Sequence, residues 1–252
     1  MIISVANQKG GVGKTTTSVN LSACFGEKGK NVLLIDADPQ GNTTTGLGIN
    51  KKELEVSLYD VLINGDPIEN AIIRTDYKNL SVIPSNIDLA GAEIELVSTM
   101  ARETVLQRAL SDIKSSYDYI IIDAPPSLGL LTVNCLCASE YVLIPIQCEY
   151  YAMEGLSQLI NTIRLVKKNI NKRLEIEGVV LTMFDGRTNL SSQVADEVRK
   201  YFGDKVHRTV IPRNVRLGEA PSYGMPISVY DPKCIGTEAY NSLADEIIES
   251  HS

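Results

Sequence analysis

Short runs of consecutive apolar, mostly β-branched residues recur along this chain, and helix-length amphipathic stretches separate them. The hydrophobicity of the runs is continuous rather than alternating, so each strand is expected to be buried on both faces, as in a parallel sheet covered by helices. The pattern predicts an α/β fold with a single doubly wound, mostly parallel sheet. The predicted strands are Ile2–Ala6, Val32–Ile35, Leu80–Ile83, Tyr119–Ile122, Tyr141–Ile146 and Gly178–Thr182.

Six amphipathic stretches are long enough to be helices, and no repeat or linker rich in Pro, Gly or Ser interrupts the alternation. We therefore expect one domain over residues 1–252. With 252 residues, 44% of them hydrophobic, such a chain can bury a sizeable core. The predicted helices are Thr15–Glu27, Arg102–Ser115, Leu130–Ala138, Met153–Lys168, Leu190–Tyr201 and Thr237–Ser250.

Composition argues against several classes of protein. No apolar run approaches the ~18–20 residues of a membrane-spanning helix. The N-terminus lacks the pattern of an export signal, so a cytoplasmic location is expected. The 5 cysteines are scattered through apolar contexts, which predicts reduced thiols in the core. The 2 histidines lie far apart in the sequence and lack the paired spacing of a metal site, so no metal-hydrolase site is expected.

Charge is distributed unevenly along the chain. The net charge is −7, yet the segment from Arg164 to Arg216 contains 12 basic and 6 acidic residues, a net of +6, which leaves −13 for the remainder. A solvated helical face and an anion-binding surface both fit such a segment.

A glycine-rich segment directly follows the first predicted strand and directly precedes a helix. In such a turn, successive backbone N–H groups point at an anion and the helix dipole adds to the attraction, which makes a phosphate cradle. Lys14 would reach the β- and γ-phosphates, and the Thr15 hydroxyl would bind Mg²⁺. The residues expected to bind the nucleotide here are Lys9, Gly10, Gly11, Val12, Gly13, Lys14, Thr15 and Thr16.

The segment departs from the usual phosphate-binding pattern at two positions. Gln8 replaces the expected glycine, and Lys9 adds a second lysine. The sequence KGGVGKTT resembles the deviant Walker A motif of the ParA/MinD family of ATPases. This resemblance implies that Lys9 reaches across a two-fold interface to the phosphates held by a partner subunit, so that the ATP-bound chain forms a homodimer.

Three carboxylates follow predicted strands at the edge where the phosphate cradle lies. Asp36 and Asp38 close the second strand, and Asp123 closes the fourth. By resemblance, Asp38 orients the attacking water, Asp36 supports the metal, and Asp123 is the Walker B residue that holds Mg²⁺ through water. We therefore expect a Mg²⁺-dependent ATPase that converts ATP to ADP and phosphate, with Lys9, Lys14 and Asp38 as its catalytic residues.

Later segments resemble the chromosomal ParA branch of the family, namely QCEYYAMEG from Gln147, TMFD from Thr182 and IPRNVRLGEAPS from Ile211. The resemblance implies that Pro212 and Asn214 contact the adenine. It also implies that Arg187 and Arg216 bind double-stranded DNA without sequence preference. Both arginines fall within the +6 segment.

The implied role is chromosome or plasmid segregation on the nucleoid, with a ParB-type (Spo0J-type) centromere-binding protein stimulating hydrolysis. The alternative is a ParA-like ATPase that positions a protein cargo, which would share the same site. The C-terminal segment TEAYNSLADEIIESHS is acidic and lacks the basic face of a membrane-binding helix, so no membrane partner is expected.

Overall fold

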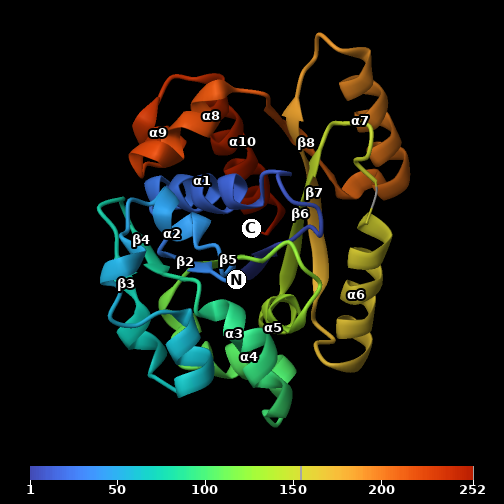
Figure 1. The fold of residues 1–252 in the computed structure, drawn as a ribbon. Helices are drawn as coiled ribbons and strands as arrows, with labels where there is room; N and C mark the ends of the chain where they lie inside the picture. The colour runs from blue at the N-terminus through green and yellow to red at the C-terminus, as the bar shows by residue number, and fades with distance from the viewer. Residues whose placement is uncertain (154, 252) are drawn as a thin grey trace.

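Eight strands form one sheet in the order β3-β4-β2-β5-β1-β6-β7-β8 (Figure 1). This computed structural model describes residues 1–153 and 155–251. Neighbouring strands pair in parallel, except that β3 is antiparallel to β4. The predicted α/β fold class is therefore confirmed. The strands are β1 (Ile2–Val5), β2 (Val32–Asp36), β3 (Ile73–Arg74), β4 (Leu80–Ile83), β5 (Tyr119–Asp123), β6 (Tyr141–Gln147), β7 (Glu175–Phe184) and β8 (Val206–Pro212).

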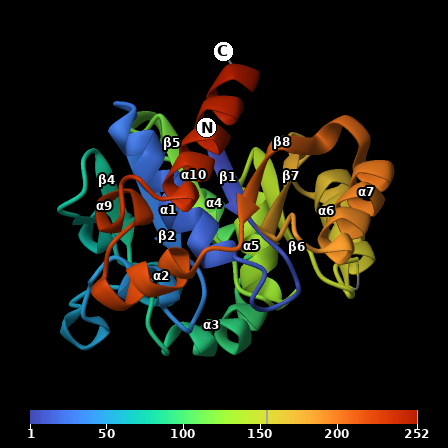
Figure 2. The same cartoon turned by 90° about the horizontal axis from the view of Figure 1, so that it is seen from above.

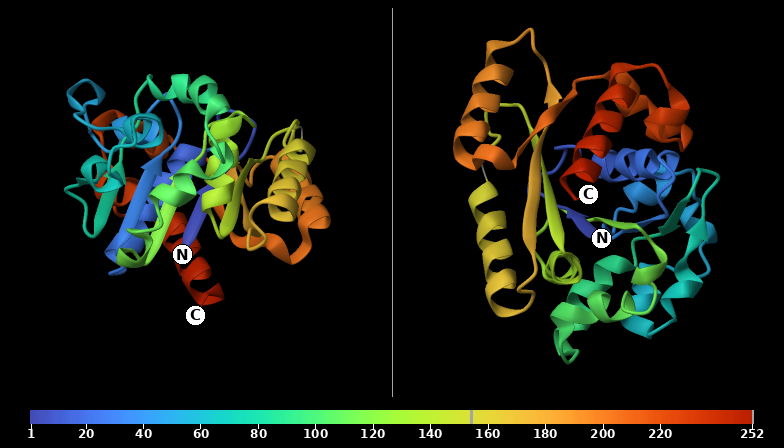
Figure 3. Two further views of the ribbon diagram at one scale, coloured as in Figure 1. Left: turned by 90° about the horizontal axis from the view of Figure 1, so that it is seen from below. Right: turned by 180° about the vertical axis from the view of Figure 1, so that it is seen from behind.

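Helices cover both faces of the sheet, and one hydrophobic cluster fills each side. Helices α1, α8, α9 and α10 pack on one face, and α3 to α7 pack on the other (Figures 1 and 3). The helices are α1 (Lys14–Glu27), α2 (Asn42–Gly46), α3 (Leu89–Glu95), α4 (Val105–Ala109), α5 (Leu130–Ala138), α6 (Leu156–Asn169), α7 (Asn189–Phe202), α8 (Val215–Glu219), α9 (Ile227–Tyr230) and α10 (Ile235–Ser250).

The central strand β1 explains why the sequence pattern predicts this arrangement. Ile3 and Val5 belong to the cluster beneath α1 and α10, whereas Ile2 belongs to the cluster on the opposite face. All four residues of β1 are buried. Side chains alternate between the faces of a strand, so a strand covered on both sides needs apolar residues at consecutive positions.

The predicted continuous helix Arg102–Ser115 is wrong in its length, because α4 within it spans only Val105–Ala109. Ala101 has a left-handed φ of 51°, and the segment after it divides into a 3₁₀ turn at Arg102–Thr104, the short helix α4, and a second 3₁₀ turn at Lys114–Ser116. The Ser111 hydroxyl donates to the carbonyl oxygen of Arg108 at 2.7 Å. Such a local side-chain bond offers the backbone an alternative to continuing the helix.

The predicted helix Met153–Lys168 begins later than expected. Gly155 has a φ of 74°, a left-handed conformation that does not continue a right-handed helix, so α6 starts at Leu156. Glu154, within the predicted range, lies outside the described residues. The other predicted helices and strands agree with the structure to within a few residues at each end, whereas β3, β8 and several short helices were not predicted.

Parallel pairing brings the carboxyl ends of seven strands to one edge of the sheet. Helices α2 and α3 lie along this edge, and the C-terminus of the chain lies at the opposite side of the molecule (Figure 2). We call the edge with the carboxyl ends of these seven strands the carboxyl edge. In the part of the chain that the structure describes, no helix is long and apolar enough to cross a bilayer.

Candidate nucleotide site

The loop between β1 and α1 forms an open cradle at the carboxyl edge. Gly11 and Gly13 have φ values of 75° and 89°, which only glycine adopts readily. Among the described residues, and leaving out the chain neighbours, no atom lies within 4 Å of the position that a Cβ would take on Gly10 or Gly11, so this backbone faces open space. Helix α1 starts without a side-chain cap or an acidic residue in its first turn. Among the described residues, its N-terminal amides therefore have no capping side chain and can bind an anion.

Lys14 lies under this loop rather than on the surface. Its side chain is buried, and Nζ donates to the carbonyl oxygen of Lys9 at 3.1 Å. Burial lowers the pKa of Lys14, and the charges of Asp123 and Asp38 oppose that effect. The structure thus brings a lysine and two carboxylates together at the cradle, as the sequence predicts.

Asp123, at the end of β5, contacts residues of two helices, α1 and α2. Its carboxylate accepts hydrogen bonds from the hydroxyls of Thr15 at 2.7 Å, Ser18 at 3.0 Å and Thr43 at 2.8 Å. Burial raises the pKa of Asp123, and these three hydrogen bonds lower it in part. Thr15 and Ser18 belong to α1 and Thr43 to α2, so the carboxylate fixes both helices relative to β5.

Asp36 lies opposite Asp123 in the register of β2 and β5. It accepts hydrogen bonds from the amide of Thr44 at 2.8 Å and from the Thr44 hydroxyl at 2.7 Å. Burial, with a smaller contribution from the Asp123 charge, raises the pKa of Asp36 to about 7. From the end of β2, Asp36 thus holds α2 in position through Thr44.

Asp38 lies just beyond β2, in the turn that leads to α2. Its Oδ1 accepts from the amide of Gln40 at 2.9 Å, and its own amide donates to Asp36 at 3.3 Å. The side chain is 8% exposed. The turn therefore holds this carboxylate in a fixed place beside the buried pair formed by Asp36 and Asp123.

Sequence reasoning missed Ser18, Thr43 and Thr44, whose hydroxyls bind the two buried carboxylates. A signal was present in the three consecutive threonines of NTTTG, directly after Asp38 and its turn. Polar residues at the start of a helix, so close to a strand-end carboxylate, are suited to bind it.

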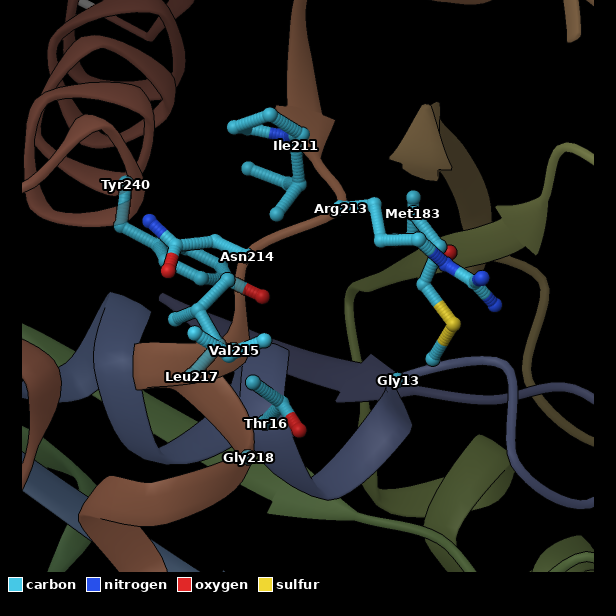
Figure 4. A pocket seen from close by; sticks show the side chains of 12 residues that line it. Gly13, Thr16, Met183, Ile211, Arg213, Asn214, Val215, Leu217, Gly218 and Tyr240 are labelled. Carbon is cyan, nitrogen blue, oxygen red and sulfur yellow. The ribbon is translucent and has the colours of Figure 1, made fainter. Parts of the chain in front are cut away.

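A cavity of about 350 Å³ adjoins the cradle (Figure 4). Pro212 and Asn214 line it, so the structure places both predicted adenine contacts next to the glycine loop. The Oδ1 atom of Asn214 accepts from the amide of Arg216 at 2.8 Å and caps α8. The lining residues are Gly13, Thr16, Thr182, Met183, Ile211, Pro212, Arg213, Asn214, Val215, Leu217, Gly218 and Tyr240.

Met183 and Tyr240 are lining residues that sequence reasoning did not assign. Met183 has a φ of 50°, which is unusual for a residue with a side chain and indicates local backbone strain at the cavity wall. Tyr240 is buried, and its hydroxyl lies 3.2 Å from that of Thr17. The cavity is apolar enough to hold a flat ring beside a phosphate site.

The two arginines predicted to bind DNA lie outside this cavity. Arg187, after β7, is 88% exposed and forms two hydrogen bonds with Asp185, at 2.8 and 2.7 Å. Arg216, in α8, pairs with Glu219 at 2.9 Å and lies 3.6 Å from Asp231. Each guanidinium is therefore accessible but already has an acidic neighbour.

Comparison with known proteins places this site in a family. A family model described as AAA domain matches residues 1–176. The chain is 63% identical to the sporulation initiation inhibitor protein Soj of Bacillus subtilis over 246 residues, 98% of this chain and 97% of that protein. It is 53% identical to the chromosome partitioning protein ParA of Caulobacter vibrioides over 249 residues, 98% and 93% of the two chains. The chain belongs to the ParA/MinD family of ATPases.

Two solved structures agree with the fold. A cobyrinic acid a,c-diamide synthase from Mycobacterium smegmatis, with bound ADP and magnesium, has a TM-score of 0.88 and 38% identity, covering 99% of this chain and 94% of that one. The cell division ATPase MinD of Pyrococcus furiosus has a TM-score of 0.81 and 29% identity, covering 100% and 99%. The predicted family assignment is confirmed.

Proposed function

We propose that the chain is a Mg²⁺-dependent DNA-partitioning ATPase, built as one ATPase domain over residues 1–252. The observation that carries the proposal is the open glycine cradle over Lys14, which adjoins both the buried carboxylate of Asp123 and an apolar cavity. Gly10–Thr16 would hold the phosphates of ATP or ADP, and Pro212 and Asn214 the adenine. The relative named for chromosome partitioning is 53% identical, compared with 38% for the cobyrinic acid a,c-diamide synthase.

The oxygen groups near the cradle suit Mg²⁺, which prefers hydroxyl, carboxylate and water oxygens. The Thr15 hydroxyl would hold the ion directly, and Asp123 and Asp36 would support it. When bound, the ion supplies positive charge that neutralises the phosphates. Thr15 already contacts Asp123, so the chain's own residues bring these oxygens together before any ligand binds.

Hydrolysis needs charge neutralisation and a positioned water more than covalent chemistry. Lys14 supplies a cation from below the loop, and Asp38 accepts a hydrogen bond from the attacking water. Lys9 of the partner subunit supplies a further cation, so turnover should depend on protein concentration. A ParB-type centromere-binding protein would then accelerate a slow basal rate.

Exposed apolar side chains near the carboxyl edge support dimerisation through this side of the molecule. Helix α3 follows a strand that runs parallel to β1, so it begins at the edge where the cradle lies. Ile94 is 77% exposed and Met100 is 90% exposed. A second subunit on this side would cover these side chains and remove their apolar surface from water.

DNA binding rests on the charge distribution. Arg187 and Arg216 lie in the +6 segment, and both have exposed guanidinium groups. Contacts with phosphates carry no base information, so binding would be independent of sequence and sensitive to salt. In this proposal the ATP-bound dimer associates with the nucleoid, and hydrolysis releases it.

Retention of the chain on a non-specific DNA duplex tests the proposal. We expect retention with ATP but not with ADP, and longer retention for Asp38→Ala with ATP. Each lost phosphate contact lowers the slope of log K against log salt by about 0.9. Arg187→Glu and Arg216→Glu should each weaken retention while sparing dimerisation. The matched control is Arg208→Glu, an 83% exposed arginine of the same segment. Two results would contradict the proposal: DNA retention that is the same with ATP and ADP, or an equal loss of retention for all three Arg→Glu variants.

A further inference from the structure

Both lysines of the glycine loop have partners within the chain. The ammonium of Lys14 donates to the carbonyl oxygen of Lys9. The ammonium of Lys9 forms an ion pair with Glu149, whose sequence position is 140 residues away. The two side chains of this pair are 27% and 42% exposed, so the contact is neither buried nor fully hydrated.

Glu149 is held in place by its backbone. It lies two positions beyond the end of β6, and its amide donates to the carbonyl oxygen of Gln147 at 2.9 Å. The preceding residue, Cys148, donates its amide to Thr182 of β7 at 3.0 Å. The carboxylate therefore emerges at the carboxyl edge, beside the glycine loop.

The loop is tied to the same strand. Asn7 accepts a hydrogen bond from the amide of Lys9 at 3.0 Å and donates its own amide to Pro145 of β6 at 2.7 Å. Lys9 and Glu149 are thus both anchored to β6. Their contact is a product of the fold, because the same strand fixes the backbone on each side of it.

We propose that Glu149 is a positioning residue that holds Lys9 within its own subunit until a nucleotide-bound partner arrives. The inference rests on the proposed function, in which Lys9 reaches the phosphates of the partner subunit. Lys9 cannot do so while its ammonium is paired with Glu149. A single carboxylate loses this competition to a polyphosphate of higher charge, so exchange occurs only when the partner carries nucleotide.

The size of the effect follows from exposure and symmetry. A partly exposed ion pair of this type changes an equilibrium by roughly twofold to fivefold. A symmetric dimer must break two such pairs, so the dimer dissociation constant changes by the square of that factor, about fourfold to twenty-fivefold.

The first test is Glu149→Gln, which keeps the shape of the side chain and removes its charge. Dimerisation is measured by sedimentation of the full chain with Mg²⁺ and a non-hydrolysable ATP analogue. We expect the dimer dissociation constant to fall by about fourfold to twenty-fivefold. Glu175→Gln is the matched control, because Glu175 also pairs with a lysine, Lys167, but lies at the start of β7, far along the strand from this edge. An unchanged or higher constant for Glu149→Gln overturns the proposal.

The second test needs no dimer. Acylation of lysine amines by an amine-reactive ester is followed by peptide mass spectrometry on the nucleotide-free chain. Glu149→Gln should raise the rate at Lys9 and leave the exposed Lys52 unchanged, and an unchanged rate at Lys9 overturns the proposal. If the wild-type chain fails to dimerise with nucleotide, the proposed function fails, and the acylation rates still decide the role of Glu149.

Discussion

His207 is a buried imidazole with a carboxylate at each ring nitrogen. Its Nε2 lies 2.7 Å from Glu177 and its Nδ1 lies 3.4 Å from Glu246. Burial alone would lower the pKa of His207, but the hydrogen bonds and charges of these two glutamates outweigh burial and raise the pKa above 6.5. The folded state therefore favours the protonated ring, and links α10 to β7 and β8 through it.

This raised pKa predicts how stability depends on pH. The contribution of His207 is complete below its unfolded pKa, near 6.5, and is lost as pH rises through the higher folded pKa. We expect the free energy of unfolding to fall in that window, by at most about 1.4 kcal/mol per pH unit, the limit for one proton. Urea unfolding from pH 6 to 9 measures it. His207→Gln should lack this component, and His251→Gln, whose ring is 4.0 Å from Glu177, should retain it. Equal slopes in the wild type and His207→Gln would contradict the prediction.

The site residues differ in how far the sequence can predict them. Asp36 and Asp123 follow continuous apolar runs, so their place at a strand end can be inferred from local pattern alone. The contact between Lys9 and Glu149 cannot, because it depends on β1 and β6 becoming neighbours. The bond from Thr43 to Asp123 has the same origin, since it depends on the pairing of β2 with β5.

At the scale of elements, α3 is joined to α5 through one side chain. Glu93 accepts hydrogen bonds from the amides of Leu130 at 2.7 Å and Leu131 at 3.2 Å. These amides open α5, which has no side-chain cap from its own N-cap residue, Gly129. A carboxylate at a helix N-terminus satisfies free donors and interacts favourably with the helix dipole.

Removal of this cap should destabilise the fold. We expect Glu93→Ala to lower the free energy of unfolding by about 1–2 kcal/mol, and Glu93→Gln by less, because the amide oxygen still accepts a hydrogen bond. Urea unfolding at neutral pH measures the change. Glu95→Ala is the control: Glu95 lies on the same helix, is exposed, and contacts the hydroxyl of Tyr59. A similar loss in both variants would mean that the cap contributes nothing specific.

The sequence predicts elements well where the apolar pattern extends over many residues, and poorly where it is short or interrupted. Strands buried on both faces have apolar residues at every position, and β2 and β5 were predicted to within one residue. The edge strand β8 lacks such a run, because only His207 and Ile211 of its residues are buried. Helices α8 and α9 have 5 and 4 residues, too few for a helical repeat to be visible.

The two edges of the sheet carry different groups of residues. The glycine loop, Asp38 and the exposed end of α3 lie toward the carboxyl edge, whereas the pair of histidines near Glu177 lies toward the other end of β7. In the proposed function, nucleotide binding and dimerisation are thus concentrated on one side. A second subunit that docks on the glycine loop would cover Lys9.

Gly10 offers a test of that arrangement. In the described part of the chain, no atom apart from the adjacent residues lies within 4 Å of a Cβ built on Gly10. Its φ is outside the left-handed region, so Gly10→Val fits the isolated subunit without strain. Near a two-fold axis the added side chains would meet each other or the partner's loop. We expect ATP affinity within about twofold of the wild type, and ATP-dependent dimerisation weakened by about tenfold to a hundredfold, as overpacking of an interface predicts.

Two further glycines make this experiment decisive. Gly186, exposed and also outside the left-handed region, is the control for the substitution itself, and Gly186→Val should dimerise normally. Gly11 has a φ of 75°, so Gly11→Val should distort the cradle and lose ATP affinity as well. Equilibrium ATP binding and sedimentation with ATP separate these cases. If Gly10→Val binds ATP and dimerises as the wild type does, Gly10 does not face a second subunit, and the interface lies away from the glycine loop.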